Sequence, residues 1–241
     1  MSVPASAVTA AREPLNQRAS RSITHPLART LLVLTFTTGL VDATSYLGLG
    51  HVFTANMTGN IVFLGFGIAG SGGLPVVSPL ISLAAFLVGS GAGGVLAARM
   101  AGRHPHHFAS ALGIEVSLVA LAALVAGVLD VRPNAISGDA VIALLALAMG
   151  VRNATIRRIA VPDLTTTVLT MTLTGLAADS PLFGGTGKGS TRRSAAVLAM
   201  LAGALTGALL LKTSLALPLV AAVVLALVSL LLYLPAAHRG A

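Results

Sequence analysis

Charged residues are scarce in this chain. Only 9% of its 241 residues are Asp, Glu, Lys or Arg, against roughly 25% in an average soluble domain. Apolar residues make up 55% and occur in blocks of about twenty, the length needed to cross a hydrocarbon layer of ~30 Å. The composition therefore excludes a soluble globular domain and predicts an all-α membrane protein.

Cysteine is absent altogether. A disulfide framework, a thiolate nucleophile and a cysteine-based metal site are therefore excluded. The sequence also lacks a nucleophile elbow and a pair of catalytic carboxylates, and the glycine-rich stretch from Gly184 to Ser190 does not end as a phosphate-binding loop does. We expect no cofactor, no metal and no enzymatic activity.

Residues 1–27 lack the apolar core and cleavage site of a signal peptide. We interpret them as a disordered cytoplasmic tail, since they are rich in Ala, Ser and Arg. The chain carries a net charge of +8, but its basic residues are scattered among short loops. They indicate membrane topology rather than nucleic-acid binding.

Eight segments are candidates for crossing the membrane. Six are apolar throughout, and they lie at about 28–48, 78–98, 109–129, 139–157, 193–212 and 215–235. Two others, 51–70 and 163–178, are polar at one end, so each is either a broken crossing or a re-entrant helix. The sequence thus predicts one transmembrane domain, 28–235, followed by a short tail, 236–241.

The distribution of Lys and Arg helps to choose between these topologies, because basic residues collect in cytoplasmic loops. If all eight segments cross and the N-terminus is inside, six of the fifteen basic residues fall outside. If 51–70 and 163–178 dip in and return, only Arg132 and Lys212 fall outside. The charges favour the re-entrant model, although 51–70 is long enough to span.

Three patterns near the start of the chain recur 111 to 114 residues later. The matched pairs are Gly39 to Thr44 with Gly150 to Thr155, Phe53 to Asn60 with Leu164 to Met171, and Gly89/Gly93 with Gly203/Gly207. They predict a duplication into repeats at about 28–130 and 139–235. Three crossings and one re-entrant segment per repeat would make the repeats inverted, an architecture in which transporters bind solutes between the halves.

Polar residues of the first repeat form the first half of a candidate substrate site. Asp42 lies within the first span, and Asn56, Thr58 and Asn60 follow the Gly48/Gly50 break. An ionisable group at that depth usually faces a bundle interior or a wet cavity. The alternative is that Asp42 is a helix cap or an interhelical tie at the outer interface.

The second repeat supplies the other half of this site. Its candidates are Arg152, Asn153, Asp163, Thr165, Thr166 and Thr167. A pair between Asp42 and Arg152 would neutralise both charges, and Asp163 could cap a helix start that faces an anion. Arg152 could instead be a cytoplasmic charge continuous with Arg157 and Arg158.

Four further features have weaker interpretations. Glu115 lies inside a span and needs a partner or a proton, so it is a candidate for proton coupling unless it reaches the interface. The threonines of 165–174 could line a path or satisfy backbone groups, and packing is favoured. We interpret the paired glycines as structural. His104, His106 and His107 could bind a metal but are expected to be solvated.

The string Ala55-Asn-Met-Thr-Gly-Asn60, with Gly39 to Gly48, Gly150 to Ala154 and Val161 to Thr167, resembles the YoaK family of bacterial multipass membrane proteins of unknown function. The resemblance covers about residues 28–235. It implies a membrane protein, but it assigns no role to Asp42, Asn56, Thr58, Asn60, Asn153 or Asp163.

The leading hypothesis is a secondary transporter of a small solute or ion in the bacterial inner membrane, with a cytoplasmic N-terminus. Its expected partners are the lipid bilayer and the solute, and a homo-oligomer is left open. The rival hypothesis is a scaffold or partner subunit, in which the same polar residues tie helices together. An intramembrane enzyme lacks a convincing nucleophile and base.

Overall fold

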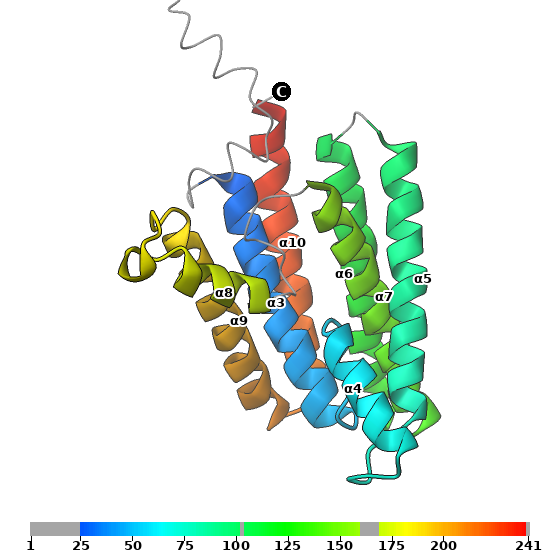
Figure 1. The fold of residues 1–241 in the computed structure, drawn as a ribbon. Helices are drawn as coiled ribbons and strands as arrows, with labels where there is room; N and C mark the ends of the chain where they lie inside the picture. Colours follow the sequence, from blue (N-terminus) through cyan, green and yellow to red (C-terminus); the bar gives the residue numbers. More distant parts are fainter. Residues whose placement is uncertain (1–24, 102–103, 160–168, 240–241) are drawn as a thin grey trace, which may run out of the picture.

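The computed structural model describes residues 25–101, 104–159 and 169–239. Within these ranges the chain forms helices joined by loops, and no strand. The elements are α3 (Pro26–Gly48), α4 (Met57–Ile68), α5 (Val77–Arg99), α6 (His104–Val128), α7 (Ile136–Ile159), α8 (Leu169–Ala178), the 3-10 helix η1 (Pro181–Phe183), α9 (Ser190–Leu211) and α10 (Ala216–Arg239) (Figure 1). The all-α prediction is confirmed.

The predicted crossings coincide with the long helices. Five helices, namely α3, α5, α6, α7 and α9, are long and apolar enough to cross a membrane. The sixth prediction falls on α10, but its apolar part among the described residues, Ala216–Leu231, is shorter than these crossings. Six full crossings are therefore not confirmed among the described residues.

The predicted domain boundaries shift slightly in the structure. Helix α3 begins at Pro26, and the ring Nδ1 of His25 accepts a hydrogen bond from the Leu27 amide at 3.3 Å. Proline suits a first helical position because its missing N–H would have no partner there. At the other end, α10 continues to Arg239, so part of the predicted tail 236–241 is helical. The predicted tail 1–27 otherwise lies outside the described residues.

Helices α4 and α8 are too short to cross. Their 12 and 10 residues give lengths of about 18 and 15 Å at ~1.5 Å per residue, well under a hydrocarbon thickness of ~30 Å. Figure 1 shows that α3 ends and α5 begins at the same, lower end of the bundle, with α4 between them. Helix α4 therefore does not carry the chain from one end of the bundle to the other.

Four helices form the centre of the bundle, and two flank it. Helices α3, α10, α6 and α7 pack side by side in that order, while α9 packs on the outside of α3 and α5 on the outside of α7. The apolar stretches of α3 and α7 are 67% and 61% buried, against 17% for both α5 and α9. Exposed leucines and valines cover the outer faces of α5 and α9. Such faces suit contact with lipid.

Glycines permit the closest helix crossings. A Cβ on Gly39 of α3 would clash with the backbone of α9 at Met200 and Gly203, and a Cβ on Gly203 would clash with the carbonyl of Phe36. Gly89 of α5 and Gly150 of α7 meet each other's helices in the same way. Small residues allow such backbone approach in membrane bundles. These contacts support the structural interpretation of the paired glycines.

Candidate functional site

Asp42 holds the chain that leads into α4. Its side chain is 6% exposed, and Oδ1 accepts hydrogen bonds from the backbone amides of Thr54 at 3.2 Å and Ala55 at 3.0 Å. Asp42 lies six residues before the end of α3, about 9 Å back along the helix. The segment after α3 therefore doubles back into the bundle, where the carboxylate satisfies two of its amides.

The second carboxylate oxygen of Asp42, Oδ2, forms no hydrogen bond with the part of the chain that the structure describes. The residue nevertheless lines a cavity. One carboxylate oxygen of Asp42 therefore holds the backbone that follows α3, and the other has no protein partner among the described residues beside the cavity.

Asn60 also forms hydrogen bonds with the segment that follows α3. Its Oδ1 accepts from the Phe53 amide at 2.9 Å, and its Nδ2 donates to the Phe53 carbonyl at 2.6 Å and to Ser82 Oγ at 3.0 Å. Ser82 Oγ also donates to the Phe53 carbonyl at 2.7 Å. Asn60 is fully buried and is not among the described residues that line the cavity. Its contacts are those of a positioning residue.

Asn56 and Thr58 lie at the start of α4. Asn56 is the N-cap, and its Oδ1 accepts from the Gly59 amide at 3.4 Å. Asparagine is a preferred N-cap because its side chain satisfies an amide that has no partner within the helix. Both residues line the cavity beside Asp42. The structure therefore brings Asp42, Asn56 and Thr58 together, as the sequence predicts.

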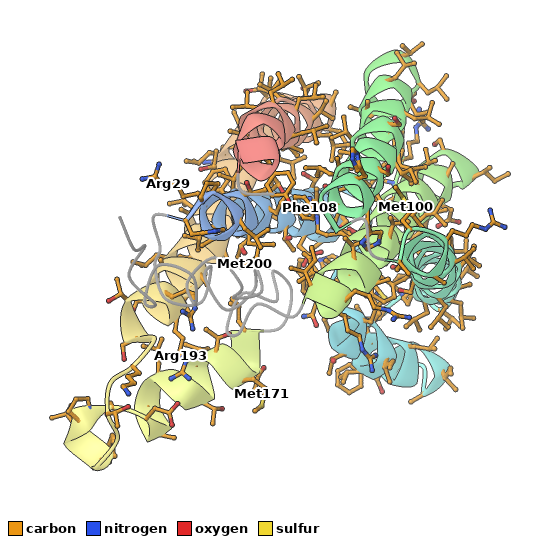
Figure 2. The ribbon with its side chains drawn as sticks, turned by 90° about the horizontal axis from the view of Figure 1, so that it is seen from above. Arg29, Met100, Phe108, Met171, Arg193 and Met200 are labelled. Carbon is orange, nitrogen blue, oxygen red and sulfur yellow. The ribbon has the colours of Figure 1, made fainter. Side chains whose placement is uncertain are left out.

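The cavity measures about 730 Å³ and lies between α3, α4, α8 and α9. This volume falls within the ~300–1,000 Å³ of known small-molecule sites. Its described lining is mainly apolar and consists of Gly39, Asp42, Ala43, Tyr46, Leu47, Phe53, Asn56, Thr58, Gly59, Val62, Phe63, Leu169, Thr170, Leu173, Met200 and Ala204. Seen from above in Figure 2, α4 and α8 lie on the same side of the bundle, and the labelled Met200 marks α9.

Arg152 does not pair with Asp42, so that prediction is wrong. Its guanidinium binds Glu115 of α6, through Nε at 2.8 Å to Oε2 and through Nη2 to Oε1. It also donates to the Leu34 carbonyl at 2.9 Å and to the hydroxyls of Thr38 and Thr37 at 2.7 and 3.0 Å. Glu115 comes closer to Arg152 than Asp42 does because α6 packs directly on α7.

Burial also excludes the cytoplasmic interpretation of Arg152. The side chains of Arg152 and Glu115 are 3% and 2% exposed. Glu115 lies 11 residues from the start of α6, so the pair is about 17 Å inside the bundle. The partner that Glu115 requires is therefore an arginine. Its role in proton coupling stays a prediction, and neither residue is among those that line the cavity.

The remaining predicted residues fall in different places. Asn153 is half-buried on α7, and its Nδ2 donates to the Met149 carbonyl of its own helix at 2.9 Å. Asp163, Thr165, Thr166 and Thr167 lie outside the described residues. In α8, Thr170 lines the cavity, whereas Thr174 donates to the Thr170 carbonyl at 2.9 Å, which is a backbone-satisfying role. The described side chains form no group of three or more metal-binding residues.

Several residues of the site were missed at the level of sequence. Tyr46, Phe53 and Phe63 line the cavity with their rings 4.8 to 5.9 Å apart. Tyr46 follows Asp42 by four residues on α3, so helical periodicity alone places the two on one face. Ser82 and Met200 carried no comparable signal, because they belong to other helices.

Comparison with known proteins agrees with the membrane fold. Residues 30–232 match the family described as "Protein of unknown function (DUF1275)". The UPF0700 transmembrane protein YoaK of Bacillus subtilis (strain 168) is 35% identical over 150 residues, which are 62% of this chain and 65% of that protein. The chain thus matches slightly less than two thirds of that relative's length. No solved structure matches it. The chain belongs to the DUF1275 family of membrane proteins, and its resemblance to YoaK is confirmed.

Proposed function

We propose that the protein is a secondary transporter of a small solute, in which two inverted halves move against each other around the cavity at Asp42. The observation that carries this proposal is the cavity of about 730 Å³. Its lining comes from α3 and α4 of the first half and from α8 and α9 of the second. A solute site between two halves is the arrangement that alternating access requires.

Helix packing supports the division into α3–α6 and α7–α10. In this division the counterparts are α3 and α7, α4 and α8, α5 and α9, and α6 and α10. The principal packing pairs of one half then recur in the other: α5 packs on α7 as α9 packs on α3, α6 packs on α7 as α10 packs on α3, and α4 packs on α5 as α8 packs on α9. In Figure 1, α3 runs down the view and α7 runs up, while α5 runs up and α9 runs down. Counterpart helices therefore run in opposite directions, as they do in an inverted repeat.

The glycine contacts repeat with the same offsets. Gly93 of α5 lies against Val151 and Ala154 of α7, and Gly207 of α9 lies against Leu40 and Ala43 of α3. These pairs are separated by the 111 and 114 residues of the sequence repeat. Two crossings with matched contacts at matched positions support duplication more strongly than similar composition does.

The charge distribution supports a cytoplasmic N-terminus in a bacterial inner membrane. Arg99 ends α5, and Arg157 and Arg158 lie in the last turn of α7; both helices end at the end of the bundle where α3 begins (Figure 1). Arg132 precedes the start of α7 and Lys212 follows the end of α9, at the opposite end. Basic residues are retained on the cytoplasmic side. A maleimide should therefore label Ser71→Cys from outside and Ala101→Cys only from inside, with no background in a chain that has no cysteine. The reverse labelling would contradict this orientation.

Solute flux in proteoliposomes tests the proposal. A panel of cations, anions and neutral solutes should include one whose uptake depends on the protein. Asp42→Asn and Asn56→Ala should reduce that uptake at least tenfold, whereas Asp130→Asn, the same chemical change at an exposed loop residue, should not. Protein-dependent flux that is indifferent to both cavity variants would contradict the proposed site. A lack of flux for every solute would favour the scaffold.

The scaffold hypothesis also has a specific observation in its favour. Asp42 Oδ1 and Asn60 are satisfied by the backbone of residues 53–55, which is what residues that tie helices together would do. The scaffold hypothesis gives no role to Asp42 Oδ2 or to the cavity beside it. The transporter therefore accounts for more of the site.

A further inference from the structure

The charges around the cavity are of one sign. Among the described residues that line it, Asp42 carries the one charged side chain, and none is Lys, Arg or His. The nearby guanidinium of Arg152 is already bound by Glu115 and by groups of α3. An anion entering the cavity would therefore meet a carboxylate without a counter-charge, whereas a cation would supply the partner that Asp42 Oδ2 lacks.

Aromatic rings are concentrated beside this carboxylate. The chain contains 7 Phe, 2 Tyr and no Trp, yet Tyr46, Phe53, Phe63 and Phe66 form one connected cluster. Tyr46 and Phe53 stack at 4.8 Å, and Phe63 lies 5.9 Å from both rings. The first three of these rings line the cavity. Ring faces attract cations, and aromatic side chains are used in proteins to bind alkylated ammonium groups.

A bare metal ion fits the lining less well than an organic cation does. Calcium takes six to eight oxygen ligands, and magnesium requires nearly ideal octahedral geometry. The polar side chains of the described lining are Asp42, Tyr46, Asn56, Thr58 and Thr170, and the other eleven residues are apolar or glycine. A cation that carries its own apolar surface would use both the carboxylate and the apolar wall.

Among the described residues, the start of α4 is a feature that points toward an anion. A helix N-terminus bears partial positive charge and often binds anions. Here that end is already occupied by groups of the protein itself, since Asn56 caps α4 and the Asp42 carboxylate accepts the amides of Thr54 and Ala55 just before it. The Asp42 carboxylate is therefore the negative group at this helix start, and the cavity beside it can hold a cation.

We infer that the cavity binds a small organic cation, an ammonium or alkylammonium ion, with Asp42 as its counter-ion and Tyr46, Phe53 and Phe63 as its aromatic wall. The inference deepens the proposed function, on which it depends only for the consequence that such a cation is carried across the membrane.

Calorimetric binding to the full chain in detergent tests this inference. The probes are choline chloride, its neutral isostere 3,3-dimethylbutan-1-ol, sodium chloride and sodium acetate. The wild type should bind choline and should bind the other three at least tenfold more weakly. Equal binding of the neutral isostere, stronger binding of acetate, or no binding of choline would overturn the inference. This comparison requires no variant, so a misfolded mutant cannot obscure it.

Variants then assign the binding to the named groups. Asp42→Asn should weaken choline binding at least tenfold, and Tyr46→Leu or Phe53→Leu should weaken it several-fold. Phe108→Leu is the aromatic control, because the Phe108 ring packs edge-on against Tyr233, with ring centroids 4.7 Å apart, and does not line the cavity. This variant should bind as the wild type does. Should Asp42→Asn fail to fold, Asp42→Glu, which keeps the charge, should retain binding. Unchanged affinity in a folded Asp42→Asn would overturn the inference.

Flux measurements separate this inference from the proposed function. Choline binding that depends on Asp42, without flux of any solute, would uphold the cation site and overturn the transporter. Flux of an anion or a neutral solute that depends on Asp42 would uphold the transporter and overturn the cation site.

Discussion

Among the described residues of this bundle two carboxylates are buried, those of Asp42 and Glu115, and their surroundings differ sharply. Glu115 is fully paired with Arg152 and lies in a nearly closed region, where threonines of α3 complete the guanidinium's hydrogen bonds. Asp42 has one oxygen satisfied by backbone amides and one oxygen free beside a cavity of about 730 Å³. The same sequence signal, an acid within an apolar span, thus leads to a structural tie in one place and to a candidate binding group in the other.

The two carboxylates also differ with respect to the predicted repeat. Arg152 corresponds in that repeat to Val41, an apolar core residue, so the ion pair would have no counterpart in it. Asp42 corresponds to Asn153, which keeps a polar group at the matched position. Polarity is retained where the proposed solute site lies, whereas the ion pair joins α6 of one proposed half to α7 of the other and is not repeated.

The largest expected effect on stability comes from breaking the ion pair. Arg152→Met leaves the Glu115 carboxylate buried without a partner and should lower the free energy of unfolding by about 3–5 kcal/mol. Thermal unfolding in detergent measures this change. The double variant Arg152→Met/Glu115→Leu should recover most of the loss, because no buried charge remains. A single variant as stable as the wild type would show that the pair is not the tie described here.

An intermediate effect on stability is expected from breaking the hydrogen bonds that hold residues 53–60. Asn60→Ala removes three hydrogen bonds to Phe53 and Ser82 and should cost about 1–3 kcal/mol, because buried backbone groups lose their partner. Hydrogen exchange should rise in residues 53–60 more than in α6 or α7. Asn56→Ala is the control, since it removes one long N-cap bond and should cost about 1 kcal/mol. Equal exchange in both variants would contradict the positioning role of Asn60.

The smallest effect on stability is expected from Asp42→Asn, although its effect on function should be the largest. The asparagine oxygen can still accept the amides of Thr54 and Ala55, so the variant should unfold within about 1 kcal/mol of the wild type. Glu115→Gln is the matched change in the other region, and it should be clearly less stable because Arg152 loses its counter-charge. Thermal unfolding of the two variants side by side decides the comparison, and the opposite order would contradict it.

Much of the fold could be predicted from the sequence. Apolar blocks located the long helices to within a few residues, and α3 ends at Gly48, at the predicted break. The short lengths of α4 and α8 agree with the polar character of 51–70 and 163–178. The sixth predicted crossing, 215–235, falls on α10, whose described apolar part is Ala216–Leu231, so it stays a prediction.

The candidate site was predicted less completely. Asp42, Asn56 and Thr58 meet at one cavity, as a local sequence of polar residues after a helix break suggests. Asn60 belongs to the same string but faces Phe53 and Ser82 instead. The partner of Arg152 was predicted wrongly, because pairing across the repeat axis was inferred from symmetry and not from which helices touch.

The sequence by itself determined that this is a helical membrane protein with short polar segments, because hydrophobic length and the placement of glycine are local properties of the chain. Only the tertiary structure decided which buried acid is neutralised and which stays open. That outcome depends on which helix brings an arginine within hydrogen-bonding distance, and α6 packs on α7 while the lower part of α3 faces a cavity.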